Sequence, residues 1–321
     1  MRREFVIWGV TGAIVVVALG MAVFVLNSTL YSASGFVGSY LSALERKDAD
    51  AALELVGASV SGDASRELLV RDAIGELSDI QLVGETEAAG THQVTYSYLA
   101  GDVAAQSTFD VRGSGALFGL FATWDFVDSP FGVMHVNALN DPRFSANGVE
   151  LISPTPNDPA PYLVFAPGTL ELDHETRWLE ASAVTVTISE PGRSVPTAVI
   201  AVPNEDFVAE VQRAVNAHLE QCTTQSVLLP TGCPFGRPVS NRIVSPPIWT
   251  MVTFPVATIE PTDTAGEWSM PATAGTAHVV VDVKSLFDGT VTTVDEDVPF
   301  TARYRIVVLP NDQVLVTPLV D

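Results

Sequence analysis

The hydrophobic pattern begins with an apolar run that contains no charged residue, from Phe5 to Leu26. At about 1.5 Å of rise per residue, a helix of this length covers roughly 33 Å, and the hydrocarbon core of a bilayer is about 30 Å thick. A helix satisfies its own backbone hydrogen bonds, so such a segment is stable in lipid. Residues 5–26 are therefore predicted to form one transmembrane helix that anchors the chain in the bilayer.

The charges around this run predict its orientation. Arg2 and Arg3 precede it, and the next basic residue is Arg46. The positive-inside rule then places residues 1–4 in the cytoplasm and everything after the helix outside. A cleaved signal peptide is the alternative, but its apolar region is about 7 to 15 residues long, which is shorter than this run. The predicted localisation is the cell membrane, single-pass, with the C-terminal domains extracellular.

Beyond the run, the apolar positions follow a helical period. They are Phe36, Val37, Tyr40, Leu41 and Leu44, which make one stripe on a helix. Asp48 is the predicted N-cap of a second, short helix, and Gly57 is suited to its C-terminal end. A third helix is predicted from Asp63 as cap and from the spacing of Val70, Ile74 and Leu77.

After residue 90 the period changes from helical to alternating, which predicts strands. The alternating apolar positions are Val94, Tyr96 and Tyr98, then Val103, Ala105, Phe109 and Val111, then Phe118, Leu120, Trp124 and Phe126. Gly101-Asp102 is the predicted turn between the first two runs. Helices followed by an antiparallel meander predict an α+β domain over residues 28–127.

The stretch SGFVGSYLSALERKDADAALELVG, followed by hairpins, resembles the opening of an NTF2-like (nuclear transport factor 2-like) domain. The resemblance implies a curved sheet around a conical pocket, which Tyr96, Tyr98, Asp110 and Trp124 would line. The alternative is that these residues belong to an ordinary sheet face packed on helices. The fold serves enzymes, binders and scaffolds alike, so it implies no particular reaction.

Residues 130–200 contain short apolar runs separated by turn signals, which predict a small β domain. Asn147-Gly148 suits a type I′ hairpin turn. The phrases SANGVEL and YLVFAPGTLEL resemble the β-rich extracellular modules of TcaA-type, teicoplanin-resistance-associated, membrane proteins. Those proteins also join a membrane helix to NTF2-like modules. The cytoplasmic zinc ribbon common in that group has no counterpart in this sequence.

Residues 203–321 are predicted to form a second α+β domain, cystatin-like or NTF2-like. Asn204 is the predicted cap of a helix, and acidic Glu205 and Asp206 favour its positive end. The buried face of this helix is predicted to consist of Phe207, Val211, Val215 and Leu219. Strands are predicted over residues 248–259, 277–286, 301–309 and 314–319.

Charge narrows the range of partners. The chain has 38 Asp and Glu against 16 Lys and Arg, for a formal net charge of -22. Binding nucleic acid requires cationic side chains that displace counterions, so we expect no nucleic acid partner. The only lysines are Lys47 and Lys284, and this usage resembles that of high-GC actinobacteria.

Two cysteines, Cys222 and Cys233, lie beyond the predicted membrane crossing, where oxidation is permitted. We expect a structural disulfide between them. A redox-active pair is usually Cys-x-x-Cys, and zinc would need two further ligands nearby.

We expect no metal, no cofactor and no catalytic constellation. The Asp173-His174-Glu175 triple is interpreted as a hydrated turn, because neighbours on a strand point to opposite faces and cannot chelate together. Ser114 lacks the glycines of a nucleophile elbow and is predicted to lie in a loop between strands. Asp295-Glu296-Asp297 lacks the spacing and central glycine of a calcium loop and is interpreted as solvated surface.

The sequence therefore predicts a single-pass, membrane-anchored extracytoplasmic protein of the cell envelope. Its predicted role is noncatalytic binding or scaffolding towards cell-wall polymer or another membrane protein. The alternative is a small-ligand binder or enzyme that uses an NTF2-like pocket, and ligand-dependent thermal stabilisation would distinguish the two.

Overall fold

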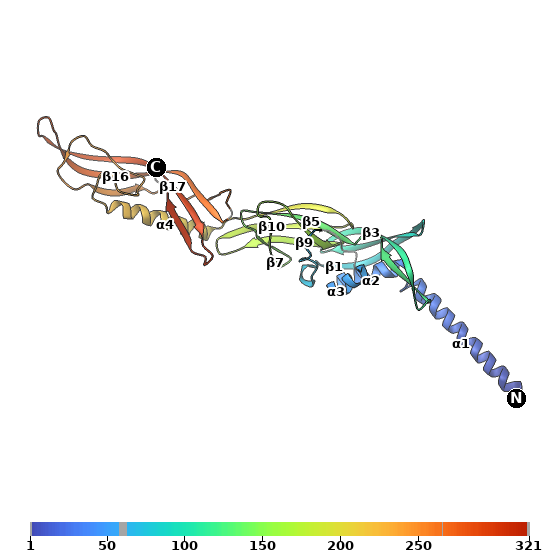
Figure 1. The fold of residues 1–321 in the computed structure, drawn as a ribbon. Helices are drawn as coiled ribbons and strands as arrows, with labels where there is room; N and C mark the ends of the chain where they lie inside the picture. Colours follow the sequence, from blue (N-terminus) through green and yellow to red (C-terminus); the bar gives the residue numbers. More distant parts are fainter. Residues whose placement is uncertain (1, 58–62, 265, 320–321) are drawn as a thin grey trace. The chain divides into compact units, whose positions relative to one another are not determined.

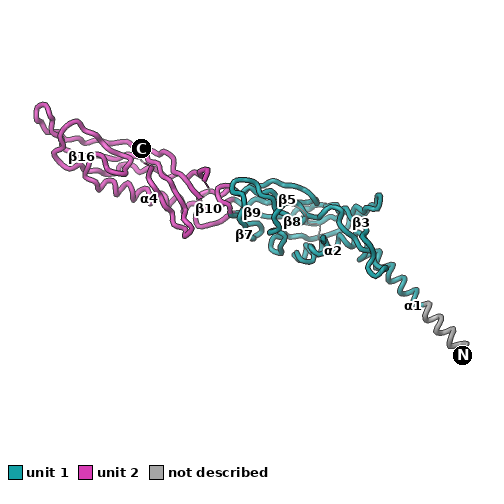
Figure 2. The backbone as a smooth tube through the Cα atoms, in the orientation of Figure 1, with its two compact units in different colours: residues 1–138, 143–173, 182–199 teal, residues 139–142, 174–181, 200–321 magenta. Residues whose placement is uncertain are grey.

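The structure, a computed structural model, describes residues 2–57, 63–264 and 266–319, with side chains from residue 14 onward. It is a mixed α+β structure in which strands predominate, as predicted (Figure 1). The chain forms two compact units (Figure 2). Unit 1 comprises residues 1–138, 143–173 and 182–199, and unit 2 comprises residues 139–142, 174–181 and 200–321. The division into three domains and the NTF2-like and cystatin-like resemblances stay predictions.

The first helix, α1, runs from Arg2 to Ser28. Most of its apolar side chains between Ile14, at 62%, and Val25, at 50%, are exposed, and Val23 is half-buried. Among the residues described with side chains, no single helix is long and apolar enough to cross a membrane. Ile14–Ser28 and Ala33–Glu45, bent by 60° at the break between them, meet the length and composition criteria as a pair.

The next two helices confirm the predicted pattern. Helix α2 (Ala33–Glu45) has Ser32 as its N-cap and buries most of the predicted stripe. Its residues Val37, Tyr40, Leu41 and Leu44 are at 0% exposure, and Phe36 is half-buried. Helix α3 (Ala49–Val56) is capped by the Asp48 carboxylate, which accepts a hydrogen bond from the Ala51 amide at 3.1 Å. Gly57 ends it with φ +72°, a conformation that suits glycine.

The predicted third helix is wrong over the described residues from Asp63 onward; residues 58–62 lie outside the description. The structure has a short 3-10 turn, η1 (Arg71–Ala73), and then extended chain. Gly75 packs directly on another backbone segment, because a Cβ atom there would lie 2.3 Å from the carbonyl oxygen of Thr169. The segment is buried by tertiary contacts rather than by one helical face, and the i, i+4, i+7 spacing is coincidental.

Helices α2 and α3 cover a four-stranded antiparallel sheet of order β1-β2-β3-β4. Its strands are β1 (Leu77–Ala88), β2 (Thr91–Ala100), β3 (Val103–Leu117) and β4 (Phe121–Phe126). The alternating runs are thus confirmed as strands, although residues 118–120 form a turn and Ser114 lies within β3 rather than in a loop. Ser114 Oγ donates to Thr123 Oγ1 at 3.2 Å.

Two further sheets follow. One has the order β11-β5-β8, made by β5 (Phe131–Leu139), β8 (Ala160–Phe165) and β11 (Ser194–Ile200). The other has the order β12-β10-β9-β6-β7, made by β6 (Arg143–Ala146), β7 (Val149–Ile152), β9 (Gly168–Glu175), β10 (Leu179–Ile188) and β12 (Val202–Pro203). Asn147 and Gly148 have φ values of 49° and 81°, as the predicted hairpin turn requires.

In unit 1, the core of the first sheet continues into these later strands. Its buried cluster includes Phe131, Leu163 and Phe165 beside the residues of α2 and α3. The Tyr40 hydroxyl on α2 donates to the carbonyl oxygens of Pro130 at 2.9 Å and Ala166 at 3.1 Å. Residues on both sides of the predicted domain boundary at 128–130 therefore share one core.

The main part of unit 2 is one helix and one antiparallel sheet. Helix α4 (Glu205–Thr223) starts at Asn204, whose side chain accepts from the Phe207 amide at 3.0 Å, and its predicted apolar face is fully buried. The long hairpin of β16 (Glu267–Lys284) and β17 (Val291–Val308) is extended by β18 (Val314–Pro318). The strands β13 (Arg242–Ile243), β14 (Ile248–Thr253) and β15 (Glu260–Pro261) all pair with β16.

Candidate functional site

A groove of about 690 Å³ lies between α2 and β1 in unit 1. One wall is a stripe of small residues on α2, Gly35, Gly38, Ser39 and Ser42. Their spacing of three and four residues places them on one helix face, separate from the buried stripe that packs on the sheet. Small side chains on this face keep the groove open.

The opposite wall is the irregular edge strand β1. Its pairing with β2 is interrupted between Ser78 and Gln81, and Asp79 in this interval has φ +53°. Such a bulge leaves a residue unpaired and bends the strand. Asp79 and Gln81 consequently line the groove as polar groups.

Tyr96 on β2 contributes to the floor of the groove. Its hydroxyl donates a 2.9 Å hydrogen bond to the carbonyl oxygen of Ser34. Burial, and to a smaller extent the charge of Glu85, raise the pKa of Tyr96, so the phenol is neutral at physiological pH. A Cβ atom at Gly38 would lie 2.8 Å from this hydroxyl, so glycine permits the close approach.

The chemistry of this groove is hydrogen bonding. Hydroxyl groups, the amide of Gln81 and the charged groups of Asp79, Glu45 and Arg46 surround it. The groove is thus suited to binding a polar ligand through hydroxyl and amide contacts.

The four residues predicted to line an NTF2-like pocket lie in different surroundings. Tyr96 faces the α2–β1 groove, and Tyr98 borders a second hollow while its hydroxyl lies 2.6 Å from Ser107 Oγ. Asp110 points to the opposite sheet face, into an acidic hollow shared with Asp128. Trp124 packs edge-on against His92. Alternation along β2 and β3 separates Asp110 from the two tyrosines.

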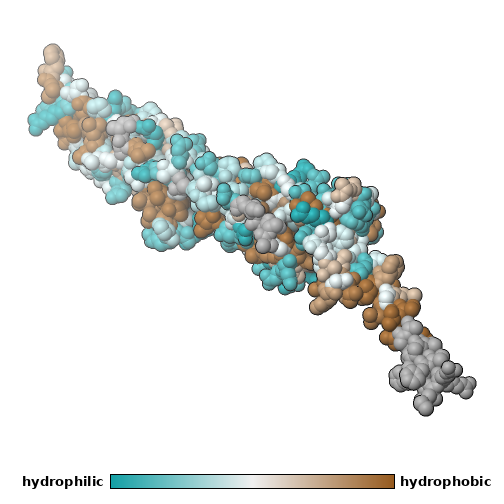
Figure 3. All heavy atoms as spheres, turned by 45° about the vertical axis from the view of Figure 1, so that its right-hand side comes forward, coloured by the Kyte–Doolittle hydropathy of each residue, from teal (hydrophilic) through white to brown (hydrophobic). Residues whose placement is uncertain are grey.

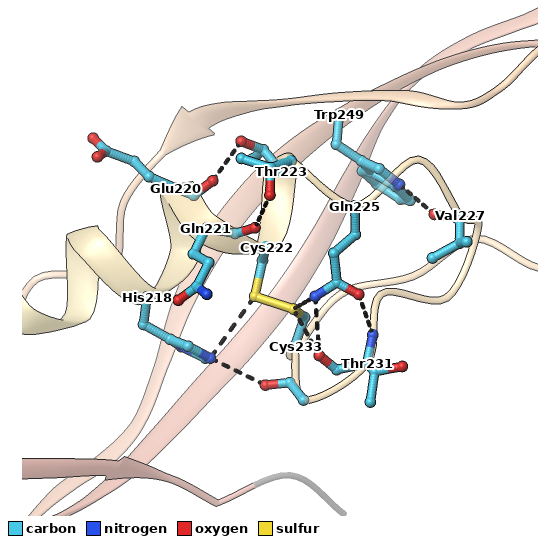
Figure 4. Close-up of a disulfide and its surroundings, with 12 residues drawn as sticks. His218, Glu220, Gln221, Cys222, Thr223, Gln225, Val227, Thr231, Cys233 and Trp249 are labelled. Carbon is cyan, nitrogen blue, oxygen red and sulfur yellow. Dashed lines mark hydrogen bonds between the residues drawn. A yellow bond between two sulfur atoms is a disulfide. The ribbon is translucent and has the colours of Figure 1, made fainter.

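In unit 2, the predicted disulfide between Cys222 and Cys233 is confirmed. It ties the end of α4 to the loop that follows it (Figure 4). Gln225 braces this loop, because its side chain accepts from the Thr231 amide at 2.8 Å and donates to the Thr231 carbonyl at 3.1 Å. The Cys222–Cys233 disulfide thus closes a small loop that Gln225 holds by hydrogen bonds.

His218 adjoins the disulfide, and its ring nitrogen and the two sulfurs lie within 4.8 Å of one another. Both sulfurs are already bonded, so they are not thiolate ligands. Nδ1 of His218 lies 2.9 Å from the Tyr304 hydroxyl and Nε2 lies 3.1 Å from the Gly232 carbonyl oxygen. Burial lowers the pKa of His218 and raises the pKa of Tyr304 to about 12. A neutral imidazole that accepts from Tyr304 and donates to Gly232 satisfies both contacts, which marks a structural role.

The prediction that His174 lies in a hydrated turn is wrong. The residue lies on β9, is 4% exposed, and has Nε2 at 3.8 Å from a carboxylate oxygen of Asp141. Asp141 is far away in the sequence and carries no motif, so no local pattern could indicate this buried pair.

Comparisons with protein-family models, with curated proteins and with solved structures found no match to this chain.

Proposed function

We propose that this protein is a single-pass, membrane-anchored extracytoplasmic protein of the cell envelope. Its role is noncatalytic, as a binding or scaffold module towards cell-wall polymer or a membrane partner. The observation that carries the proposal is the surface of α1. Four consecutive residues, Ile14 to Val17, are between 58% and 71% exposed.

Consecutive helical residues point in directions about 100° apart, so these four cover the whole circumference of the helix. A helix that docks on a protein needs only one apolar face, whereas one that is apolar all round belongs in a fully apolar surrounding. Helix α2 has already buried its apolar stripe in unit 1. Lipid around α1 is the solvent that this distribution favours.

The test of the anchor uses the full chain in cells. Val16→Arg combined with Leu19→Arg should release the protein from the membrane fraction on carbonate extraction, because each central charge costs about 3 kcal/mol of insertion. Leu229→Arg, an equally exposed leucine of unit 2, is the matched control and should stay in the membrane. Retention of the double variant would contradict the anchor.

The orientation has a separate test. Protease added to whole cells should degrade residues beyond α1, since the proposal places both units outside. Complete protection of both units, with intact membranes verified by a cytosolic marker, would contradict the extracytoplasmic location.

The binding role is tested at the α2–β1 groove. The protein should sediment with purified cell wall, or recover a partner from solubilised membranes. Ser42→Trp should lower that binding because the indole fills the groove. Glu54→Trp, an exposed position on α3 outside the groove, should leave binding unchanged.

The second candidate is binding of a small ligand at the same groove, favoured by its volume and its hydroxyl groups. A ligand at about 100 times its dissociation constant stabilises a protein by about 2.7 kcal/mol. A thermal-shift screen of metabolites and wall fragments would reveal such a ligand, and Ser42→Trp should abolish its effect.

A further inference from the structure

The hairpin that joins β3 to β4 ends in an apolar tip, Leu117, Phe118 and Leu120 around Gly119. Phe118 is 86% exposed, Leu120 51% and Leu117 45%. No residue between Arg112 and Asp125 is charged, whereas 17% of the whole chain is charged. This tip, defined by residues 117–120, therefore presents an uncharged apolar surface without a covering segment among the described residues.

The tip is fixed to the end of α1. The side-chain amide of Asn27, in the last turn of α1, donates to the Leu120 carbonyl oxygen at 2.7 Å. Its carbonyl oxygen accepts from the Ala122 amide at 3.0 Å. The rings of Tyr31 and Phe121 stack with centroids 4.6 Å apart. Together these contacts place the hairpin tip beside the helix where the predicted membrane span ends.

The conformation of Phe118 gives an independent indication. Phe118 and Gly119 both have positive φ, 54° and 71°, and the Leu120 amide closes the turn on the Leu117 carbonyl oxygen at 3.1 Å. Bulky residues rarely adopt this conformation. Two other hairpin turns of unit 1 share it and use Ala89-Gly90 and Asn147-Gly148. Only at residue 118, among these turns, is a strained position occupied by a large, exposed aromatic.

The strained backbone at Phe118 does not bury its side chain within the fold. Such strain indicates that the side chain contacts something outside the protein. We propose that the tip inserts into the interfacial layer of the same lipid bilayer that holds α1. This inference rests on the proposed anchor. Apolar faces at such a boundary are buried about 5–10 Å into the region where headgroups meet acyl chains. Figure 3 shows apolar surface on the described part of α1 and on the adjoining end of unit 1.

Lipid is the proposed partner of the tip because the tip lies at the same depth relative to the bilayer as Asn27. If residues 5–26 fill the hydrocarbon core, Asn27 lies at its edge, and the bonded Leu120 lies there too. The tip then makes a second membrane contact. Two contacts fix the orientation of unit 1 relative to the bilayer, whereas one helix alone would let it rotate.

The test uses the full chain reconstituted in liposomes of phosphatidylcholine and phosphatidylglycerol. A photo-reactive benzoylphenylalanine replaces Phe118 in one variant, Phe24 in a second and Asn147 in a third. Phe24 reports on the lipid around α1, and Asn147 occupies a turn of the same backbone conformation elsewhere in unit 1. Lipid adducts should form at residue 118, and adducts at residue 147 should stay at background.

Each outcome decides one part of the inference. Adducts at residue 24 but not at residue 118 overturn the tip proposal and leave the anchor intact. Absence of lipid adducts at residue 24 overturns the anchor itself and the tip proposal with it. Adducts of residue 118 with a second protein chain identify a protein interface and overturn the lipid proposal. Leu120 is a second probe position, used if the variant at 118 does not fold.

Discussion

His278 on β16 and Asp297 on β17 lie directly opposite each other, with the imidazole Nδ1 2.8 Å from a carboxylate oxygen. Asp295, two residues away on the same face, approaches Nε2 at 3.1 Å. The hydrogen bond with Asp297 is the main cause that raises the pKa of His278, with the charge of Asp295 adding to it. The acidic run, which the sequence analysis interprets as solvated surface, thus surrounds an imidazole and favours its protonated form.

A raised pKa in the folded state determines the sign of the pH effect. The imidazolium contributes its stability fully below the unfolded pKa of about 6.5, and that contribution is lost as pH rises through the higher folded value. His278→Gln should therefore lower Tm more near pH 5.5 than near pH 8, measured by circular dichroism. Asp295→Asn with Asp297→Asn should remove that difference. An equal effect of His278→Gln at both pH values would contradict the ion pair.

Removal of the Tyr40 hydroxyl should lower the free energy of unfolding. Its buried hydroxyl serves two carbonyl groups, of Pro130 and Ala166, and burial raises the pKa of Tyr40. Tyr40→Phe removes both hydrogen bonds, although the Pro130 carbonyl keeps the Ala166 amide as a donor at 3.0 Å, and should cost about 1–3 kcal/mol in denaturant unfolding. Tyr96→Phe removes one bond to Ser34 at a more accessible position and should cost less.

Gly75 should tolerate no side chain. A Cβ atom at this residue would lie 2.3 Å from the Thr169 carbonyl oxygen, whereas at Gly84 nothing lies within 4 Å. Overpacking against backbone costs about 1–3 kcal/mol or more, so Gly75→Ala should lower Tm clearly. Gly84→Ala is the matched control and should leave Tm nearly unchanged. Equal stability of the two variants would show that residues 73–76 do not pack on Thr169.

The disulfide should stabilise unit 2 by closing a short loop. The two cysteines are 11 residues apart, and loop-closure entropy then corresponds to about 3 kcal/mol. Cys222→Ser with Cys233→Ser should lower the free energy of unfolding by that amount. The indole of Trp249, bonded to the Val227 carbonyl at 2.8 Å, lies close to the loop and offers a fluorescence signal for the measurement.

Sequence patterns predicted the features that depend on residues close together in the chain. The caps at Asp48 and Asn204 and the alternating strands depend on residues within a few positions of one another, and all are observed. The segment around Gly75 depends on Thr169, which is distant in the sequence, and the helical spacing there was misleading.

The candidate sites show the same limit. Alternation within one strand does not show which sheet face a residue of the next strand takes. The register that pairs Tyr96 with Ser107 was needed to place Asp110 on the opposite face. The α2–β1 groove depends on a bulge in β1. The buried contact of His174 with Asp141 depends on the fold, which brings two segments distant in the sequence together. No motif at these positions marks either feature.

Phe118 should be replaceable with a gain in stability. Its left-handed backbone costs a non-glycine residue about 1–2 kcal/mol, and asparagine tolerates this conformation better than phenylalanine. Because the ring is 86% exposed, its removal loses little packing. In detergent, Phe118→Asn should therefore raise Tm, while Phe118→Ala should change it less because the strain remains. A lower Tm for Phe118→Asn would mean that the ring packs within unit 1, and the argument that its strain serves a contact outside the fold would then fail.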